Sequence, residues 1–144
     1  MTIPNWAILA RHSIFTAIEQ SDAFFRPATE VEAVDWLKQN TNYSDAVLST
    51  YWTGSYIPAR AGNIVYLGQR YETIQFEDKL DKVATFFSEF SNDADRISLI
   101  KANRIAYVFY GTRERALGSF NPMKTDYLEP VFSNSSVTIY RVRK

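Results

Sequence analysis

The sequence has no cysteine and only one histidine, His12. Without cysteine, the chain cannot form a disulfide framework, a thiolate zinc site or a cysteine nucleophile. A Ser-His-Asp triad or a histidine-based metal site would need a histidine near the other functional residues, whereas we expect His12 in a helix at the N-terminus, away from them. Hydrolase and metalloenzyme functions therefore have no support, and we expect no metal and no cofactor.

The sequence also lacks an excess of charge of either sign. Sixteen acidic and sixteen basic residues give a formal net charge of zero, and neither sign forms a run. A polyanion such as DNA, or an anionic membrane surface, gains no long-range attraction from such a chain. We therefore expect no nucleic-acid partner.

Long apolar runs are absent as well. No stretch approaches the roughly 18 apolar residues that would cross a bilayer, and the first residues do not combine a basic segment with an apolar signal core. We expect the chain as given to be soluble. A location outside the cytoplasm would require a further segment before Met1 to take it there.

The sequence does contain enough apolar material for one folded core. Apolar residues make up 46% of the 144 residues and aromatic residues 15%. A chain of this length buries about two thirds of its unfolded surface. We predict a helix or connector over residues 1–23, with apolar positions from Ile3 to Ile18, followed by a single α/β domain over residues 24–144.

Three stretches in this domain have the pattern of helices. Thr29 and Glu32 have the spacing of a capping box, which predicts a helix over residues 29–39. Apolar residues at helical spacing predict a second helix over residues 76–90. An N-cap at 91–93 begins the third.

Short apolar runs bounded by turn residues have the profile of buried strands, and they fall at residues 45–49, 63–68 and 105–110. About fourteen residues separate the first two runs, so we expect a crossover with one or two helical turns that end at Gly62. A last pair of runs, 128–132 and 137–142, is typical of a hairpin. The order of elements predicts a three-layer, Rossmann-like α/β domain with a mostly parallel sheet and an antiparallel C-terminal hairpin.

In open parallel sheets, ligands bind beyond the carboxyl ends of the strands. We expect three loops to meet there, at residues 51–60, 69–75 and 111–125. These loops combine aromatic faces, hydroxyl groups and charged groups of the kinds that bind sugars or phosphates. The candidate ligand-binding residues are Trp52, Thr53, Ser55, Tyr56, Arg60, Arg70, Tyr71, Glu72, Arg113 and Glu114.

Part of this set is predicted to line one shared concavity, namely Trp52, Tyr56, Arg60, Arg70, Tyr71 and Arg113. The alternative is that the loop aromatics cap the core and that Arg and Glu form exposed ion pairs of small value. Glu72 and Glu114 are the only carboxylates that this topology could bring together as an acid and a base. Residues 111–118 lack the spacing of a GxGxxG motif or a P-loop, so nucleotide binding has no support.

Five groups of short motifs occur in order along the chain: FRP and EAVDWL within 25–37, VL and TGSYIPA within 47–59, G and ET within 68–73, YVFYG at 107–111, and VTIYRV at 137–142. In order and spacing they resemble the soluble C-terminal domain of bacterial polytopic membrane glycosyltransferases. Those proteins are relatives of the protein mannosyltransferases that use polyprenyl-phosphate sugars. The resemblance runs from about residue 24 to the end.

In proteins of that kind, the catalytic acid and the spans that hold the lipid-linked donor belong to the membrane part. The resemblance therefore implies a non-catalytic accessory domain on the extracytoplasmic face of the cell membrane. The N-terminal helix would stand where the last membrane span is joined. The implied partners are the membrane-spanning part of the same protein and a carbohydrate or polyprenyl-linked sugar, with contact to carbohydrate or acceptor as the expected task.

Two other functions stay open. The chain could be a free-standing soluble α/β protein that binds a small ligand, or an enzyme that uses the same loops at the carboxyl edge of the sheet. The aromatic surplus could instead mark a protein-protein interface, with a membrane part or in a homodimer.

Overall fold

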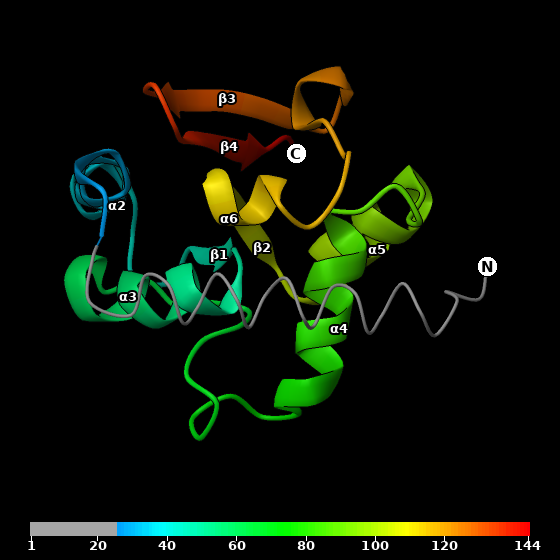
Figure 1. Cartoon of the computed structure of the whole chain (residues 1–144), viewed down its shortest axis with the longest axis horizontal. Helices are drawn as coiled ribbons and strands as arrows, with labels where there is room; N and C mark the ends of the chain where they lie inside the picture. Colours follow the sequence, from blue (N-terminus) through cyan, green and yellow to red (C-terminus); the bar gives the residue numbers. More distant parts are fainter. Residues whose placement is uncertain (1–25) are drawn as a thin grey trace.

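A computed structural model describes residues 26–144 of the protein (Figure 1). The connector predicted over residues 1–23, with His12, lies outside the described residues. The elements run in the order α2 (Ala28–Asn40), β1 (Ala46–Leu48), α3 (Tyr51–Ala61), α4 (Phe76–Phe86), α5 (Asp93–Ala102), β2 (Ile105–Tyr110), α6 (Thr112–Arg115), the 3-10 helix η1 (Pro122–Lys124), β3 (Leu128–Ser133) and β4 (Thr138–Val142).

The sheet has four strands in the order β1-β2-β4-β3. β1 and β2 are parallel, whereas β2 with β4 and β3 with β4 are antiparallel. The prediction of a mixed α/β domain with an antiparallel C-terminal hairpin is confirmed. The sheet is not mostly parallel as predicted, because two of its three strand pairs are antiparallel, and the Rossmann-like arrangement is not confirmed.

The run at 63–68 is the reason for that difference. It pairs with β1 only through a single parallel bridge between Val65 and Val47. Val47 donates its N–H to the carbonyl of Ile64, and Tyr66 donates to the carbonyl of Val47, both at 3.0 Å. The chain then leaves the sheet at Gly68, whose N–H is bonded to the hydroxyl of Thr73. The predicted direction is right, but only one residue of the run pairs with β1, so it forms a bridge and not a strand.

Helix α2 forms where it was predicted, although its start differs. Pro27 is the N-cap, and its carbonyl accepts from the N–H groups of Glu30 and Val31. The predicted capping box is therefore wrong, because Thr29 already lies within the first turn. The amide of Asn134 instead donates to the carbonyl of Thr29 and to the carboxylate of Glu32.

The segment at 51–60, in which a binding loop with one or two helical turns was expected, is the eleven-residue helix α3. Its sequence is rich in residues of modest helix propensity, so packing rather than propensity decides its conformation. Gly54 allows close approach here, since a Cβ at that position would lie 1.8 Å from the carbonyl oxygen of Leu67. The helix ends at Gly62, whose left-handed conformation (φ 84°) confirms the predicted end.

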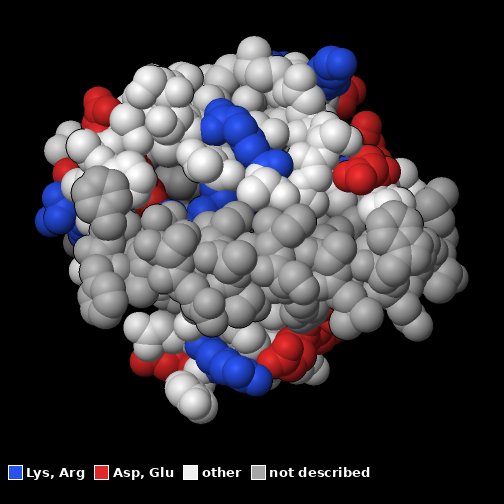
Figure 2. All heavy atoms as spheres, viewed as in Figure 1, with Lys and Arg blue, Asp and Glu red and all other residues white. Residues whose placement is uncertain are grey.

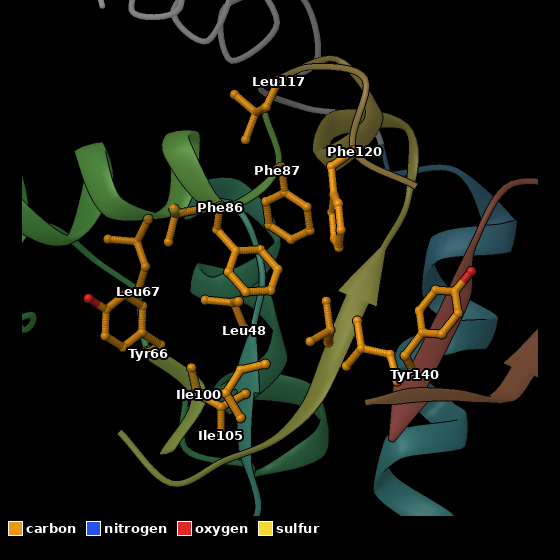
Figure 3. Close-up of a cluster of buried hydrophobic side chains, with 13 residues drawn as sticks. Leu48, Tyr66, Leu67, Phe86, Phe87, Ile100, Ile105, Leu117, Phe120 and Tyr140 are labelled. Carbon is orange, nitrogen blue, oxygen red and sulfur yellow. The ribbon is translucent and has the colours of Figure 1, made fainter. Parts of the chain in front are cut away.

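Alternating residues of the strands face two separate core clusters. On one face, Leu48, Val108 and Tyr140 pack with side chains of α4 and α5 (Figure 3). On the other face, Val47, Phe109 and Ile139 pack with side chains of α2 and α3. Helices thus cover both faces of the sheet (Figure 1), and the carboxyl ends of β1 and β2 lie together between them.

Candidate functional site

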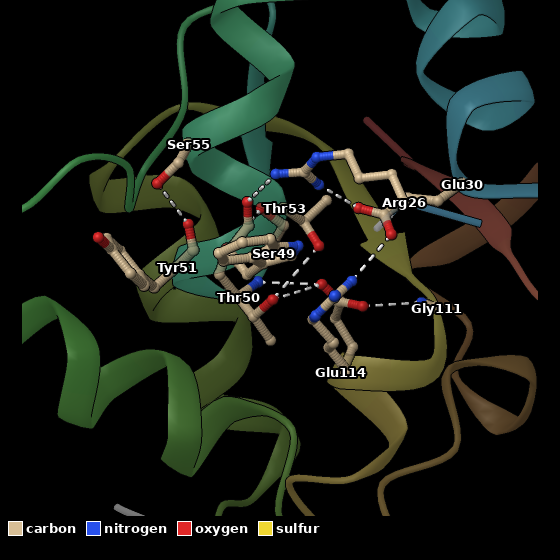
Figure 4. Close-up of polar contacts among 11 residues, drawn as sticks. Arg26, Glu30, Ser49, Thr50, Tyr51, Thr53, Ser55, Gly111 and Glu114 are labelled. Carbon is tan, nitrogen blue, oxygen red and sulfur yellow. Dashed lines mark hydrogen bonds and ion pairs between the residues drawn. The ribbon is translucent and has the colours of Figure 1, made fainter. Parts of the chain in front are cut away.

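The segments that follow β1 and β2 meet at one edge of the sheet, as two parallel neighbours require. Thr50 follows β1, and Glu114 lies in α6 just after β2 (Figure 4). One carboxylate oxygen of Glu114 accepts from the N–H of Thr50 at 3.1 Å and from its hydroxyl at 3.0 Å. The other oxygen accepts from the N–H of Gly111 at 3.0 Å. Glu114 therefore ties the ends of the two strands together.

Glu114 is 1% exposed, and its surroundings change its acidity. Burial raises the pKa of the Glu114 carboxyl, while the hydrogen bonds from Thr50 and Gly111 act in the opposite direction. The predicted partner, Glu72, lies on an exposed loop and lines a different cavity. The expected pairing of Glu72 with Glu114 as acid and base is therefore not formed.

Beside Glu114 lies a group of charged and aromatic side chains that we call the rim cluster: Arg26, Glu30, Trp52, Tyr56 and Arg113. Its centre is the buried carboxylate of Glu30, which binds two arginines. Arg26 donates to one oxygen of Glu30 at 2.6 Å, and Arg113 donates to the other at 2.8 Å. A second amino group of Arg26 donates to the carbonyl of Trp52 at 3.1 Å.

The aromatic rings of the rim cluster lie against the same guanidinium groups. The guanidinium carbon of Arg26 is 4.8 Å from the ring centre of Trp52 and 4.0 Å from that of Tyr56. Arg113 lies 5.1 Å from the ring centre of Trp52. All three distances are within the range of cation-π attraction. Burial lowers the pKa of Arg26, and the carboxylate of Glu30 counteracts this shift. The indole N–H of Trp52 is buried and has no acceptor among the described residues.

A cavity of about 220 Å³ opens next to the rim cluster. Three predicted site residues line it, namely Thr53, Arg113 and Glu114, together with Glu30. The structure therefore brings this part of the predicted set to one place. Trp52 and Tyr56 lie beside these residues, because both rings contact Arg26 and the ring of Trp52 also contacts Arg113.

The other predicted site residues lie elsewhere. Arg60 forms a bidentate pair with Asp35 of α2 at 2.6 and 2.9 Å, and Arg70 pairs with Glu77 at 2.9 Å. Tyr71 is fully exposed. Because residues 51–61 form a helix, Trp52, Tyr56 and Arg60 follow one another at four-residue spacing along one face of α3. Arg60 lies one turn beyond Tyr56, where its guanidinium group is bound to Asp35 of α2. The six-residue concavity that the sequence predicts is thus divided among separate places.

Ser55 has a local role in the same helix, since its hydroxyl donates to the carbonyl of Tyr51 at 2.8 Å. Sequence reasoning missed Arg26, Glu30 and Thr50 as members of this site. Glu30 and Arg113 are 83 residues apart, and no local sequence pattern predicts such a pair. The only signal was the position of Arg26 directly before Pro27, at the start of a predicted helix.

Charged side chains are scattered over the face of the molecule that Figure 2 shows. In Figure 2, basic and acidic groups form small separate patches on the part of the face that is not drawn in grey. Within residues 26–144, no three histidine, cysteine, aspartate or glutamate side chains are grouped so that they could hold a metal ion. The same residues contain no helix with the length and hydrophobicity needed to cross a membrane.

The fold and the site define a mixed α/β domain in which the buried carboxylate of Glu114 joins the ends of the two parallel strands. No protein-family model and no curated protein matches the chain. Among solved structures, the C-terminal globular domain of oligosaccharyltransferase from Archaeoglobus fulgidus is similar, with a TM-score of 0.60 and 16% sequence identity. The match covers 83% of this chain and 100% of that one. At this level of identity, the likeness shows a shared fold.

Proposed function

We propose that the protein is the extracytoplasmic accessory domain of a membrane glycosyltransferase-like protein and that it contacts carbohydrate or the glycosyl acceptor without catalysing the transfer. The observation that carries the proposal is the likeness to a complete C-terminal domain of an oligosaccharyltransferase. The short motifs of the sequence support the same kind of domain. Its partners would be the membrane-spanning part of the same protein and a carbohydrate or polyprenyl-linked sugar.

The chemistry of the site supports a binding role rather than acid-base catalysis. Both oxygens of Glu30 are occupied by arginines, and both oxygens of Glu114 by Thr50 and Gly111. A general acid or base must reach the proton that it transfers, and these carboxylates are already engaged within the protein. Hydroxyl-rich ligands could instead meet the guanidinium donors and the ring edges of the rim cluster.

Glycan binding by the full chain tests the proposed contact. We expect a glycan array or a thermal-shift screen to identify a carbohydrate that the parent protein binds. The variant Tyr56→Ala should weaken this binding because it removes a ring of the rim cluster. Arg70→Ala is the matched control, since Arg70 is exposed and pairs with Glu77 away from the rim. Equal loss of binding in the two variants, or the absence of any bound glycan, would contradict carbohydrate binding at the rim cluster.

The membrane partner is tested separately. Reading the native coding sequence upstream of Met1 should reveal several membrane spans that end just before this domain. An open reading frame that begins at Met1 would instead favour the free-standing ligand-binding protein. Trp52→Phe and Arg60→Ala variants are screened with the same carbohydrates. They would then show whether binding depends on the rim cluster or on the predicted residue that is paired with Asp35.

A further inference from the structure

A second concave surface lies at the opposite end of β2 from the rim cluster. The rim cluster follows the carboxyl end of β2, whereas this groove, of about 740 Å³, lies at its beginning, beside the end of β4 and the end of α5. We call it the basic groove because five of its side chains are cationic: Lys101, Arg104, Arg141, Arg143 and Lys144.

The acidic side chains of the basic groove balance only part of its positive charge. Only two acidic residues, Asp45 and Glu129, line the groove. Glu129 is bound to Arg141 at 2.7 Å, and this contact lowers the pKa of the Glu129 carboxyl. The carboxylate of Asp45 accepts from the backbone N–H of Asn42 at 2.8 Å. Glu129 also attracts Arg143 electrostatically, whereas Lys101, Arg104 and Lys144 form no ion pair with an acidic side chain of residues 26–144.

One of these cations, Arg104, has an unusual backbone conformation. Arg104 has a φ of 51°, in the left-handed region that glycine and asparagine adopt at least cost. It forms the tight turn between α5 and β2 and lines the groove with its exposed side chain. Asparagine occupies the preceding position, 103, instead of this one. A residue held in such a conformation is a reason to look for a function of its side chain.

A concave surface with several like charges concentrates the electrostatic potential and attracts the opposite charge. Arginine and lysine are the residues that bind phosphate, because a guanidinium group matches two phosphate oxygens and an ammonium group acts as a point charge. Phosphate groups carry more than one negative charge and several acceptor oxygens, so that one group can meet several cations at once. A neutral sugar would gain nothing from this excess of charge.

We propose that the basic groove binds a phosphate-bearing ligand through Lys101, Arg104, Arg143 and Lys144. The shared chemistry is the phosphoryl group, which a soluble diphosphate or the headgroups of an anionic lipid surface can supply. The proposal is independent of carbohydrate contact at the rim cluster, because the two surfaces lie at opposite ends of β2. The net charge of zero conceals this groove, since the acidic residues that balance the cations are on other parts of the chain.

The experiment uses the full chain and two probes at low ionic strength, pyrophosphate and lipid vesicles. Calorimetry measures pyrophosphate binding. Co-sedimentation compares vesicles of phosphatidylcholine containing phosphatidylglycerol with vesicles of phosphatidylcholine alone. Binding of pyrophosphate identifies a soluble ligand as the source, and binding only to the anionic vesicles identifies a lipid headgroup. Absence of binding to both probes overturns the proposal.

Charge-matched variants show whether the groove itself is responsible. Lys101→Gln combined with Arg104→Gln should weaken binding about tenfold or more, because each cation near a phosphate contributes separately. Lys82→Gln combined with Arg70→Gln removes the same charge from exposed pairs elsewhere and should change binding less than about twofold. Equal losses in the two variants would indicate unspecific attraction and would overturn the proposal.

A third variant acts in the opposite direction. Glu129→Gln removes an acidic group from the groove and releases Arg141 from its ion pair. Binding of the same probe should become stronger, which a general loss of folding could not produce. Weaker binding in Glu129→Gln would contradict the proposal. Equal melting temperatures of parent and variants, measured by circular dichroism, confirm that the comparison concerns folded protein.

Discussion

Thr50 and Glu114 are 64 residues apart in the chain, yet the backbone N–H and the hydroxyl of Thr50 both donate to the same carboxylate oxygen of Glu114. This relationship joins the start of α3 to α6 and thereby closes the edge at which β1 and β2 end. The carboxylate is buried, so its charge has no water to stabilise it and depends on these few donors.

The stability of the protein should therefore depend on pH through Glu114. Its folded-state pKa is raised above the ordinary value of 4.5 by burial. The stabilisation from a raised pKa is complete below the unfolded-state pKa and is lost as the pH rises through the folded-state pKa. We expect the advantage of the parent over Glu114→Gln, measured as free energy of unfolding in urea, to be largest near pH ~4 and to decrease toward pH ~7. A difference that does not change with pH would show that the hydrogen bonds to Glu114 offset the effect of burial on its pKa.

The buried ion pairs of Glu30 give a second prediction. Glu30→Gln removes the negative charge between Arg26 and Arg113, and it leaves two guanidinium groups facing each other in a partly buried place. We expect a loss of about 3 kcal/mol in the free energy of unfolding. Asp35→Asn is the control on the same helix, since its pair with Arg60 is exposed to water, and little change is expected there. Similar unfolding curves for both variants would contradict the structural role of Glu30.

Close packing at Gly54 gives a third prediction. Gly54→Ala places a methyl group where the carbonyl oxygen of Leu67 lies only 1.8 Å away, so that α3 or the segment after the Val65 bridge must move. We expect a loss of roughly 3 kcal/mol, seen as a lower melting temperature. The neighbouring change Ser55→Ala, which removes one half-buried hydrogen bond to Tyr51, should cost about 0.5 kcal/mol. A Gly54→Ala protein as stable as the parent would mean that the approach is less close.

Arg96 gives a fourth prediction, away from the candidate site. Its buried guanidinium group donates to the carbonyls of Phe86 and Ser88 at 2.8 and 2.6 Å and lies 3.9 Å from the ring centre of Phe120. Arg96→Met would leave both carbonyls buried without this donor, and we expect a loss of about 3 kcal/mol. The exposed Lys82→Met variant is the control and should unfold at nearly the parental urea concentration. An unchanged midpoint for Arg96→Met would show that water replaces the guanidinium group.

The local signals in the sequence predicted those elements whose causes are local. The helix over 76–90 was recognised from its apolar spacing, and the structure has α4 over most of that range. Asn92 was expected within the N-cap segment of the next helix, and its side chain accepts from the N–H of Asp95. Gly62 was expected to end a helical segment and adopts the left-handed conformation. In each case the energetic preference resides within a few neighbouring residues.

The candidate site could be predicted only in part. Trp52, Thr53 and Arg113 were placed near one another because the ends of parallel strands lie at the same edge of a sheet. Arg60 and Tyr71 were placed there as well, since residues 51–60 and 69–75 were both expected to form loops at that edge. In the structure Arg60 is bound to Asp35 and Tyr71 is exposed. Residues 51–61 form a helix because they pack closely against Leu67 rather than because of their helix propensity.

By itself, the sequence determined the composition of the core, the positions of most helices and strands, and the antiparallel pairing of the last two strands. Only the tertiary structure decided that 63–68 makes a single bridge, that Glu30 binds Arg113, and that a chain of zero net charge gathers cations in one groove. The physical reason is distance along the chain. Backbone preferences act between neighbours, whereas burial and charge depend on residues that folding alone brings together.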